Sequence, residues 1–135
     1  MKNSDLIRDT HKYLSTNVVI WWKNFGRKTL PWQIKPSKYK TWISEIMLQQ
    51  TQVNTAKPYF LKFMERFPTI EHLASCSSDE VLKIWSGLGY YARARNIHRS
   101  AGLIMEHHDG EIPSDYESLL DLPGIGNLQQ VLFYP

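Results

Sequence analysis

The sequence predicts an all-α domain, and three observations lead to that prediction. Apolar residues recur every three or four positions in several segments, which is the period of an amphipathic helix. Helix-start and helix-stop residues follow one another closely along the chain. No segment alternates apolar and polar residues over more than a few positions, as a half-buried strand would. With 135 residues, 42% of them hydrophobic, the chain is long enough for one domain with a core.

The first half of the chain contains three predicted helices and one loop. Residues 5–24 carry a broad apolar stripe at helical spacing. Residues 26–37 include one glycine and two prolines, which favour a loop. Residues 38–52 again have helical spacing. Pro58 is expected to open a further helix that stops before Pro68, because proline fits a first helical turn and interrupts a later one.

The second half contains two capping boxes, which predict where two helices begin. The first box, residues 77–80, precedes a helix that ends at the glycines of residues 87–89. Residues 91–108 form the longest predicted helix of this half. The second box, residues 114–117, precedes a short helix that ends near Leu120.

Composition limits the classes of protein that fit. The net charge of +3 leans mildly toward a polyanionic partner. Cys76 is the single cysteine, so neither an internal disulfide nor a cysteine-held metal centre is expected. No apolar run is long enough to span a membrane, and the amino terminus lacks a signal-peptide pattern. We therefore expect a cytoplasmic protein without membrane contact.

The first candidate site surrounds Glu45, within Ser44-Glu45-Ile46-Met47-Leu48-Gln49-Gln50-Thr51-Gln52-Val53. No Lys or Arg lies between Lys40 and Lys57 to pair with this carboxylate. Glu45 is either a solvated surface residue or a desolvated acid whose raised pKa suits proton delivery near neutral pH. The neighbouring glutamines are either solvated or placed to contact base edges, since amides both donate and accept hydrogen bonds.

The second candidate site is Gly87-Leu88-Gly89-Tyr90-Tyr91-Ala92-Arg93-Ala94-Arg95-Asn96. An aromatic side chain beside a flexible turn can enter a base stack, and arginines can hold phosphates. The alternative is a glycine turn followed by core tyrosines and a solvated basic face. We expect Tyr90 to contact DNA, and Arg93, Arg95 and Arg99 to supply the phosphate contacts.

The third candidate site is Leu119-Leu120-Asp121-Leu122-Pro123-Gly124-Ile125-Gly126. A short helix followed by Pro-Gly-hydrophobic-Gly is the signature of a helix-hairpin-helix. Its glycines free backbone N–H groups to bind a DNA phosphate without reading sequence. We therefore expect Leu122, Gly124 and Gly126 to bind DNA. A generic Pro-Gly turn is the alternative.

In this order and spacing, the three stretches resemble the adenine DNA glycosylases of base excision repair, the MutY family. The resemblance covers about residues 30–126. The sister family, endonuclease III, shares the third stretch but lacks the glutamic acid and paired glutamines of the first, so the adenine-specific branch is favoured. The resemblance implies a helix-hairpin-helix DNA glycosylase fold with its six-helix-barrel part mostly present and its iron–sulfur and carboxy-terminal domains absent.

The resemblance also implies an activity: removal of adenine mispaired with 8-oxoguanine or guanine in double-stranded DNA, after the adenine is flipped into a pocket. Glu45 matches the family's catalytic acid, which protonates the adenine at N7. Gln50 matches a residue that props the opened stack, and Tyr90 matches the aromatic wedge. Leu30 and Trp32 match residues near the adenine pocket.

After Gly126 the resemblance stops. The family continues there with a helix of the type Ser-Thr-Ala-Gly-Ala-Ile-Leu-Ser. Later it has a catalytic aspartate, four cysteines that hold a 4Fe–4S cluster and a carboxy-terminal domain, and this chain matches none of these. One permitted coding of residues 127–135 yields that same octapeptide when its first two bases are dropped. We therefore expect a frameshift near residue 127 that truncates the chain.

Three parts are expected along the chain. Residues 1–28 form a helix that would pack on the missing carboxy-terminal helices, residues 29–126 form a partial glycosylase domain, and residues 127–135 are an out-of-frame tail. The expected protein is a monomer, a glycosylase by ancestry that is inactive as given. The alternative is a non-catalytic helix-hairpin-helix DNA-binding module. A metal-binding protein is a third alternative, although no other ligand has suitable spacing from its three candidate histidines, His98, His107 and His108.

Overall fold

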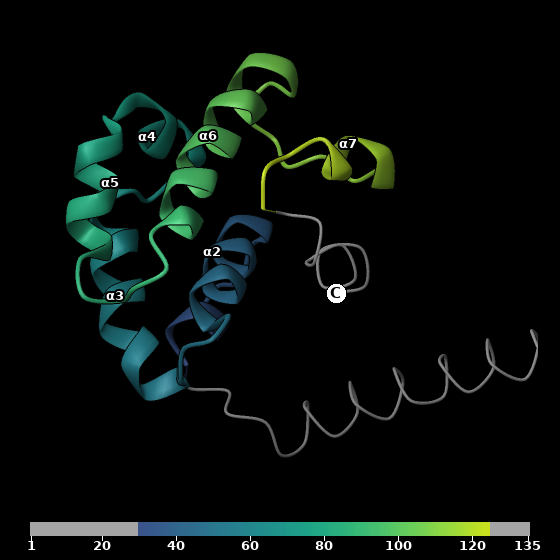
Figure 1. The fold of residues 1–135 in the computed structure, drawn as a ribbon. Helices are drawn as coiled ribbons and strands as arrows, with labels where there is room; N and C mark the ends of the chain where they lie inside the picture. Colours follow the sequence, from purple (N-terminus) through teal and green to yellow (C-terminus); the bar gives the residue numbers. More distant parts are fainter. Residues whose placement is uncertain (1–29, 125–135) are drawn as a thin grey trace, which may run out of the picture. The chain divides into compact units, whose positions relative to one another are not determined.

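The computed structural model describes residues 30–124, and every regular element in that range is helical (Figure 1). The all-α prediction is confirmed for this part of the chain. The predicted helix at residues 5–24 lies outside the described residues. The α-helices are α2 Lys38–Leu48, α3 Val53–Arg66, α4 Ile70–Ser75, α5 Ser78–Trp85, α6 Ala92–His107 and α7 Tyr116–Leu120.

A short 3-10 helix, η1, spans Pro31–Gln33 and is described by itself. The Gln33 N–H donates to the Leu30 carbonyl at 2.9 Å, and the Leu30 N–H donates to Gln33 Oε1 at 3.2 Å. Proline at the first position of the turn has a preset φ and no N–H to satisfy. The described part of the predicted loop, residues 26–37, thus contains one ordered turn.

Helix α6 is the centre of the helical unit that begins at Lys35. It packs against α4, α5 and α2, while α3 packs against α2 and α5 (Figure 1). The largest of the fully buried side chains are mostly aromatic or branched. They are Trp42, Ile43, Met47, Phe60, Phe63, Phe67, Leu73, Trp85, Ile97, Ile104 and Leu119.

The boundary between the second and third helices differs from the prediction. Helix α2 ends at Leu48 rather than at residue 52, and α3 begins at Val53 rather than at Pro58. The Gln52 carbonyl accepts the first helical hydrogen bonds, from residues 55 and 56. Pro58 lies inside α3, near its amino end, where a missing N–H removes only one helical hydrogen bond.

Two helix starts also need correction. Helix α4 was not predicted; Thr69 caps it by accepting from the His72 N–H at 3.2 Å. Helix α7 is capped by Asp115, which accepts from the Ser118 N–H at 2.9 Å, and not by Ser114. Ser114 makes a tertiary contact instead: its hydroxyl accepts a hydrogen bond from Lys38 Nζ at 2.8 Å.

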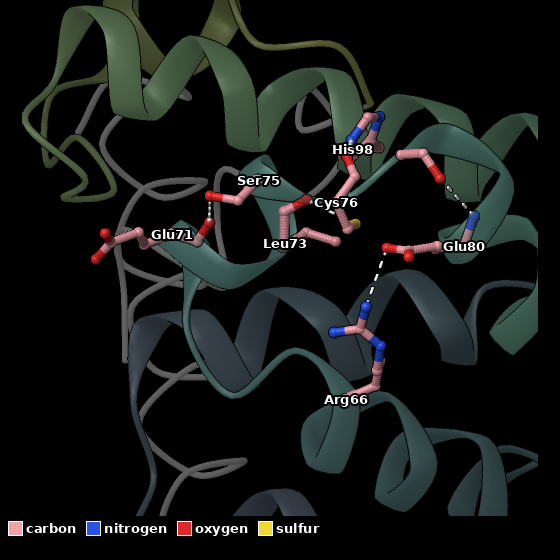
Figure 2. A network of polar contacts seen from close by, with 8 residues as sticks. Arg66, Glu71, Leu73, Ser75, Cys76, Glu80 and His98 are labelled. Atoms are coloured by element: carbon pink, nitrogen blue, oxygen red, sulfur yellow. Dashed lines mark hydrogen bonds and ion pairs between the residues drawn. The ribbon is translucent and has the colours of Figure 1, made fainter.

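Residues 75–80, between α4 and α5, form the Cys76 corner (Figure 2). Ser77 caps α5 by accepting from the Glu80 N–H at 3.2 Å, as the first predicted capping box requires. The Glu80 carboxylate bonds Arg66 of α3 at 3.0 Å. His98 of α6 lies 2.8 Å from the Cys76 carbonyl oxygen. Local caps and two outside contacts therefore hold this corner.

Candidate functional site

The three sequence stretches meet around one pocket of about 120 Å³. The first stretch contributes the end of α2, the second contributes α6, and the third contributes the hairpin turn after α7. Segments more than 70 positions apart in the sequence therefore share one site. The lining residues are Ile46, Gln49, Arg93, Asn96, Ile97, Pro123 and Gly124.

Glu45 lies in the last turn of α2 and is half-buried. Burial raises the pKa of its carboxyl above the usual range, because desolvation disfavours the charged form. Of the two alternatives for this residue, the structure favours the desolvated acid. A carboxyl with a raised pKa keeps its proton closer to neutral pH and can deliver it.

Gln50 and Tyr90 share an unusual backbone conformation. Both have positive φ, 60° for Gln50 and 48° for Tyr90, and neither is glycine. Left-handed backbone costs a non-glycine residue roughly 1–2 kcal/mol. Both side chains are nevertheless exposed, Tyr90 to 64%. Such strain persists only where the surroundings enforce it, and it concentrates at functional sites.

The guanidinium of Arg93, one of the three arginines considered for phosphate contact, bonds carbonyl groups inside the molecule. Nη1 donates to the carbonyls of Ile46 at 2.7 Å, Met47 at 3.1 Å and Gln49 at 2.6 Å. Nη2 donates to the Gly89 carbonyl at 3.2 Å. Desolvation lowers the pKa of this guanidinium, but arginine stays charged in proteins. Arg93 thus closes the carboxy end of α2.

The turn before Tyr90 is shaped by close contacts. A Cβ atom at Gly87 would overlap the hydroxyl of Tyr59, and the φ of Gly87 is +94°. The Gly87 N–H donates to the Tyr91 hydroxyl at 3.3 Å. The buried indole of Trp85 donates to the Gly89 carbonyl at 3.1 Å. Tyr90 is therefore the more exposed tyrosine of the pair, at 64% against 41%, while the hydroxyl of Tyr91 supports the turn.

The hairpin turn after α7 is fastened to α6. The buried Ser100 hydroxyl donates to the Pro123 carbonyl at 2.7 Å. Gly124 has φ +78°, and a Cβ there would lie 3.2 Å from Asn96 Cβ. Leu122 is buried, so only its backbone is available to a ligand. Gly126 lies outside the described residues.

Sequence reasoning considered Arg93 for a different role and gave no role to Asn96 or Ser100. Arg93 bonds the end of α2, Ser100 bonds the hairpin turn, and Asn96 lines the pocket beside Gly124. Their spacing of three and four positions places them on one side of α6, which was the available signal. Arg95 and Arg99 are exposed and remain the predicted phosphate contacts of this helix.

The residues of this chain do not fit an iron–sulfur cluster, since Cys76 is its single cysteine. Cys76 Sγ donates to the Leu73 carbonyl at 3.0 Å. Across residues 30–124, no three His, Cys, Asp or Glu side chains group as metal ligands would. His98, one of the histidines considered for a metal, instead contacts the Cys76 carbonyl.

The model of the HhH-GPD superfamily of base excision DNA repair proteins matches residues 43–132. The chain belongs to this superfamily.

Within the superfamily, the chain is similar to adenine DNA glycosylases. It is 55% identical to the one from Buchnera aphidicola subsp. Baizongia pistaciae over 109 residues, which is 81% of this chain and 31% of that protein. It is 47% identical to the one from Buchnera aphidicola subsp. Acyrthosiphon pisum over 133 residues, which is 92% of this chain and 38% of that protein. The chain thus spans about a third of the length of these curated relatives.

The fold is similar to that of endonuclease III, solved in a non-covalent complex with DNA. The TM-score is 0.71 at 18% identity, and the match covers 98% of this chain and 59% of that one. This similarity confirms the predicted helix-hairpin-helix glycosylase fold. No helix within residues 30–124 has the length and apolar character that crossing a membrane requires.

Proposed function

We propose that this chain is the amino-terminal catalytic segment of an adenine DNA glycosylase that removes adenine mispaired with 8-oxoguanine or guanine. One observation carries the proposal. Glu45, with its raised pKa, lies in the last turn of α2, just before the exposed and strained Gln50. A proton donor five positions before a residue suited to enter a base stack supports the proposal.

The proposed chemistry begins with a flipped adenine. Glu45 donates its proton to adenine N7, and the N-glycosidic bond then breaks with its electrons leaving on the base. Gln50 and Tyr90 occupy the opened stack, where an amide and an aromatic ring offset lost base contacts. Leu30 and Trp32 stay predicted residues of the adenine pocket.

DNA backbone contacts are assigned to the hairpin turn and to α6. The exposed Gly124 offers close backbone approach, and the exposed Arg95 and Arg99 carry charge for phosphates. These contacts bring affinity without sequence preference.

We further propose that the 135-residue polypeptide alone is catalytically inert. No residue of this sequence matches the family's aspartate, which stabilises the sugar cation, so Glu45 supplies only the acid half of the chemistry. The alternative function, a non-catalytic DNA-binding module, is favoured by the same exposed arginines and hairpin turn. Such a module has no need of a desolvated acid.

The test uses a chimera in which residues 1–126 are fused in frame to the remaining part of the Buchnera relative that is 55% identical. We expect it to release adenine from A:8-oxoguanine and A:G duplexes but not from A:T. Glu45→Gln should keep duplex binding and lose at least about 100-fold in release rate, since general-acid catalysis contributes about 10²–10⁴-fold.

Glu65→Gln is the matched control, because Glu65 is an exposed glutamate on the neighbouring helix α3. It should leave both binding and release unchanged. Release by the Glu45→Gln chimera at the parent rate would remove Glu45 from the mechanism. Binding without release by the parent chimera itself would favour the binding-module alternative.

A further inference from the structure

Gln50 and Tyr90 lie 40 positions apart, yet one side chain touches the backbone beside both. We propose that Arg93 is a positioning residue for Gln50 and Tyr90, which we call the two tips. It holds the backbone of the two tips in a fixed position relative to each other, so that they act on DNA as one unit. The part of this inference that concerns DNA rests on the proposed function; the part that concerns the free protein does not.

The two terminal nitrogens of the guanidinium each bond a carbonyl beside one tip. Nη1 donates to the Gln49 carbonyl at 2.6 Å, and Nη2 donates to the Gly89 carbonyl at 3.2 Å. Each carbonyl belongs to the peptide unit that leads directly into a tip, Gln50 in one case and Tyr90 in the other. Because a peptide unit is planar, fixing its carbonyl also fixes the N–H and Cα of the next residue.

The backbone strain at the two tips fits such an anchor. Gln50 and Tyr90 both have left-handed backbone, which non-glycine residues hold only when several contacts enforce it. The guanidinium also lies over the rings of Trp85, at 5.4 Å, and Tyr90, at 5.6 Å. A planar ion packed on two rings cannot easily tilt, so its two donor edges stay in register.

The charge of Arg93 fits this role. It lies at the carboxy end of α2, where it bonds the carbonyls of Ile46 and Met47 in the last helical turn. A cation is favoured at this end of the helix dipole. The same helix carries Glu45, so the anchor also orders the turn from which the proposed acid projects.

The first test measures amide hydrogen exchange in the free 135-residue chain and compares Arg93→Lys with the parent. Lysine keeps the charge but lacks the planar fork that reaches two carbonyls in different directions. We expect exchange to become about tenfold faster or more at Gln49 and Leu88 together, since both turns lose the same anchor. The Glu80 amide, at the Cys76 corner, is the internal reference and should not change.

Arg95→Lys is the matched control, an exposed arginine on the same helix, and it should change none of these rates. Unchanged rates at Gln49 and Leu88 in Arg93→Lys, or an increase at one of them alone, would overturn the shared anchor.

The second test is a double-mutant cycle on binding of A:G and A:T duplexes, carried out in the chimera described above, which is the parent here. In that parent, Gln50→Ala and Tyr90→Ala should be non-additive in their effect on A:G preference; in the Arg93→Lys background they should be additive. Non-additivity that survives Arg93→Lys overturns the anchor. If the parent shows no A:G preference while the exchange result holds, the anchor stands and the proposed function fails.

Salt dependence separates the anchor from a phosphate contact. Arg93→Met should leave the slope of log affinity against log salt unchanged, whereas Arg95→Met should reduce it by about one contact. A reduced slope for Arg93→Met would place the guanidinium on DNA and overturn the proposal.

Discussion

Two corners of the helical unit are built in opposite ways. The Cys76 corner, residues 75–80, begins its helix with a cap from the adjacent Ser77. The Gln50 corner, residues 49–52, has no side-chain cap on the following helix, since Gln52 makes no such bond. It is closed instead by Arg93, which lies 44 positions beyond Gln49. One corner therefore has a local side-chain cap, whereas the other lacks such a cap and is closed by a distant residue.

The two corners also differ in backbone strain. Cys76 and Ser77 have ordinary extended backbone, with φ of −86° and −77°. Gln50 has φ of 60° and is exposed. A corner that depends on distant contacts can hold a costly conformation, because the contacts that enforce it are independent of local preference. The strained corner is the one to which we assign contact with DNA.

The largest expected effect comes from removing the distant anchor. Arg93→Met should cost roughly 3 kcal/mol of unfolding free energy, because several bonds from one charged group to carbonyls are lost together. Ser77→Ala, which removes the local cap of the other corner, should cost about 1 kcal/mol. Denaturant unfolding followed by circular dichroism measures both. Equal costs would erase the contrast between the corners.

Gly87→Ala tests whether the Tyr90 turn is also enforced from a distance. We expect a cost of about 2 kcal/mol or more, from left-handed backbone and from overlap with the Tyr59 hydroxyl. Gly89→Ala is the matched control: its φ is +83°, but no atom lies within 4 Å of the added Cβ, so only the backbone cost of about 1 kcal/mol remains.

Adding Tyr59→Phe to Gly87→Ala should recover part of the cost, since it removes the overlapping oxygen. The same loss for Gly87→Ala and Gly89→Ala in unfolding experiments would mean that Tyr59 does not shape the turn.

A smaller effect depends on pH. The pKa of Glu45 is raised in the folded state, so the folded chain holds this proton at pH values where the unfolded chain has lost it. Stability should therefore fall as pH rises from the ordinary value of 4.5 through the raised pKa. Glu45→Gln should be more stable than the parent at neutral pH, and the gap should close below pH 4.5.

Unfolding curves across this pH range give the gap directly. A constant difference between Glu45→Gln and the parent at all pH values would show that the carboxyl is not desolvated.

The smallest effect concerns the strained tip itself. Gln50→Gly relieves the cost of left-handed backbone but gives the unfolded chain more freedom, and the two terms nearly cancel, leaving a change within about 0.5 kcal/mol. Tyr90→Gly should change the unfolding free energy by a similarly small amount, apart from the loss of the ring contact with Arg93. Thermal melts measure both changes. A loss of several kcal/mol for Gln50→Gly would mean that the Gln50 side chain packs in the core.

The helical fold and most element positions followed from the sequence, because their causes are local. Apolar spacing, the cap at Ser77 and the glycines after α5 act within a few residues, so they are visible in any short window. The short α4 was missed although Thr69, its cap, was available as a signal. Glu45 was singled out in the same way, because the lack of nearby cations can be seen in the sequence, and its catalytic role stays a prediction.

Only the tertiary structure decided which groups Arg93 bonds and where α2 ends. Nothing within ten residues of Arg93 indicates that it bonds carbonyls near residues 46–49. Arg95 and Arg99 are arginines of the same helix as Arg93, yet their side chains are exposed. The physical reason is that a charged side chain bonds the nearest polar groups that lack a partner. For Arg93 these are backbone carbonyls at the end of α2, and the packing of α2 on α6 brings them close although they are distant in the sequence.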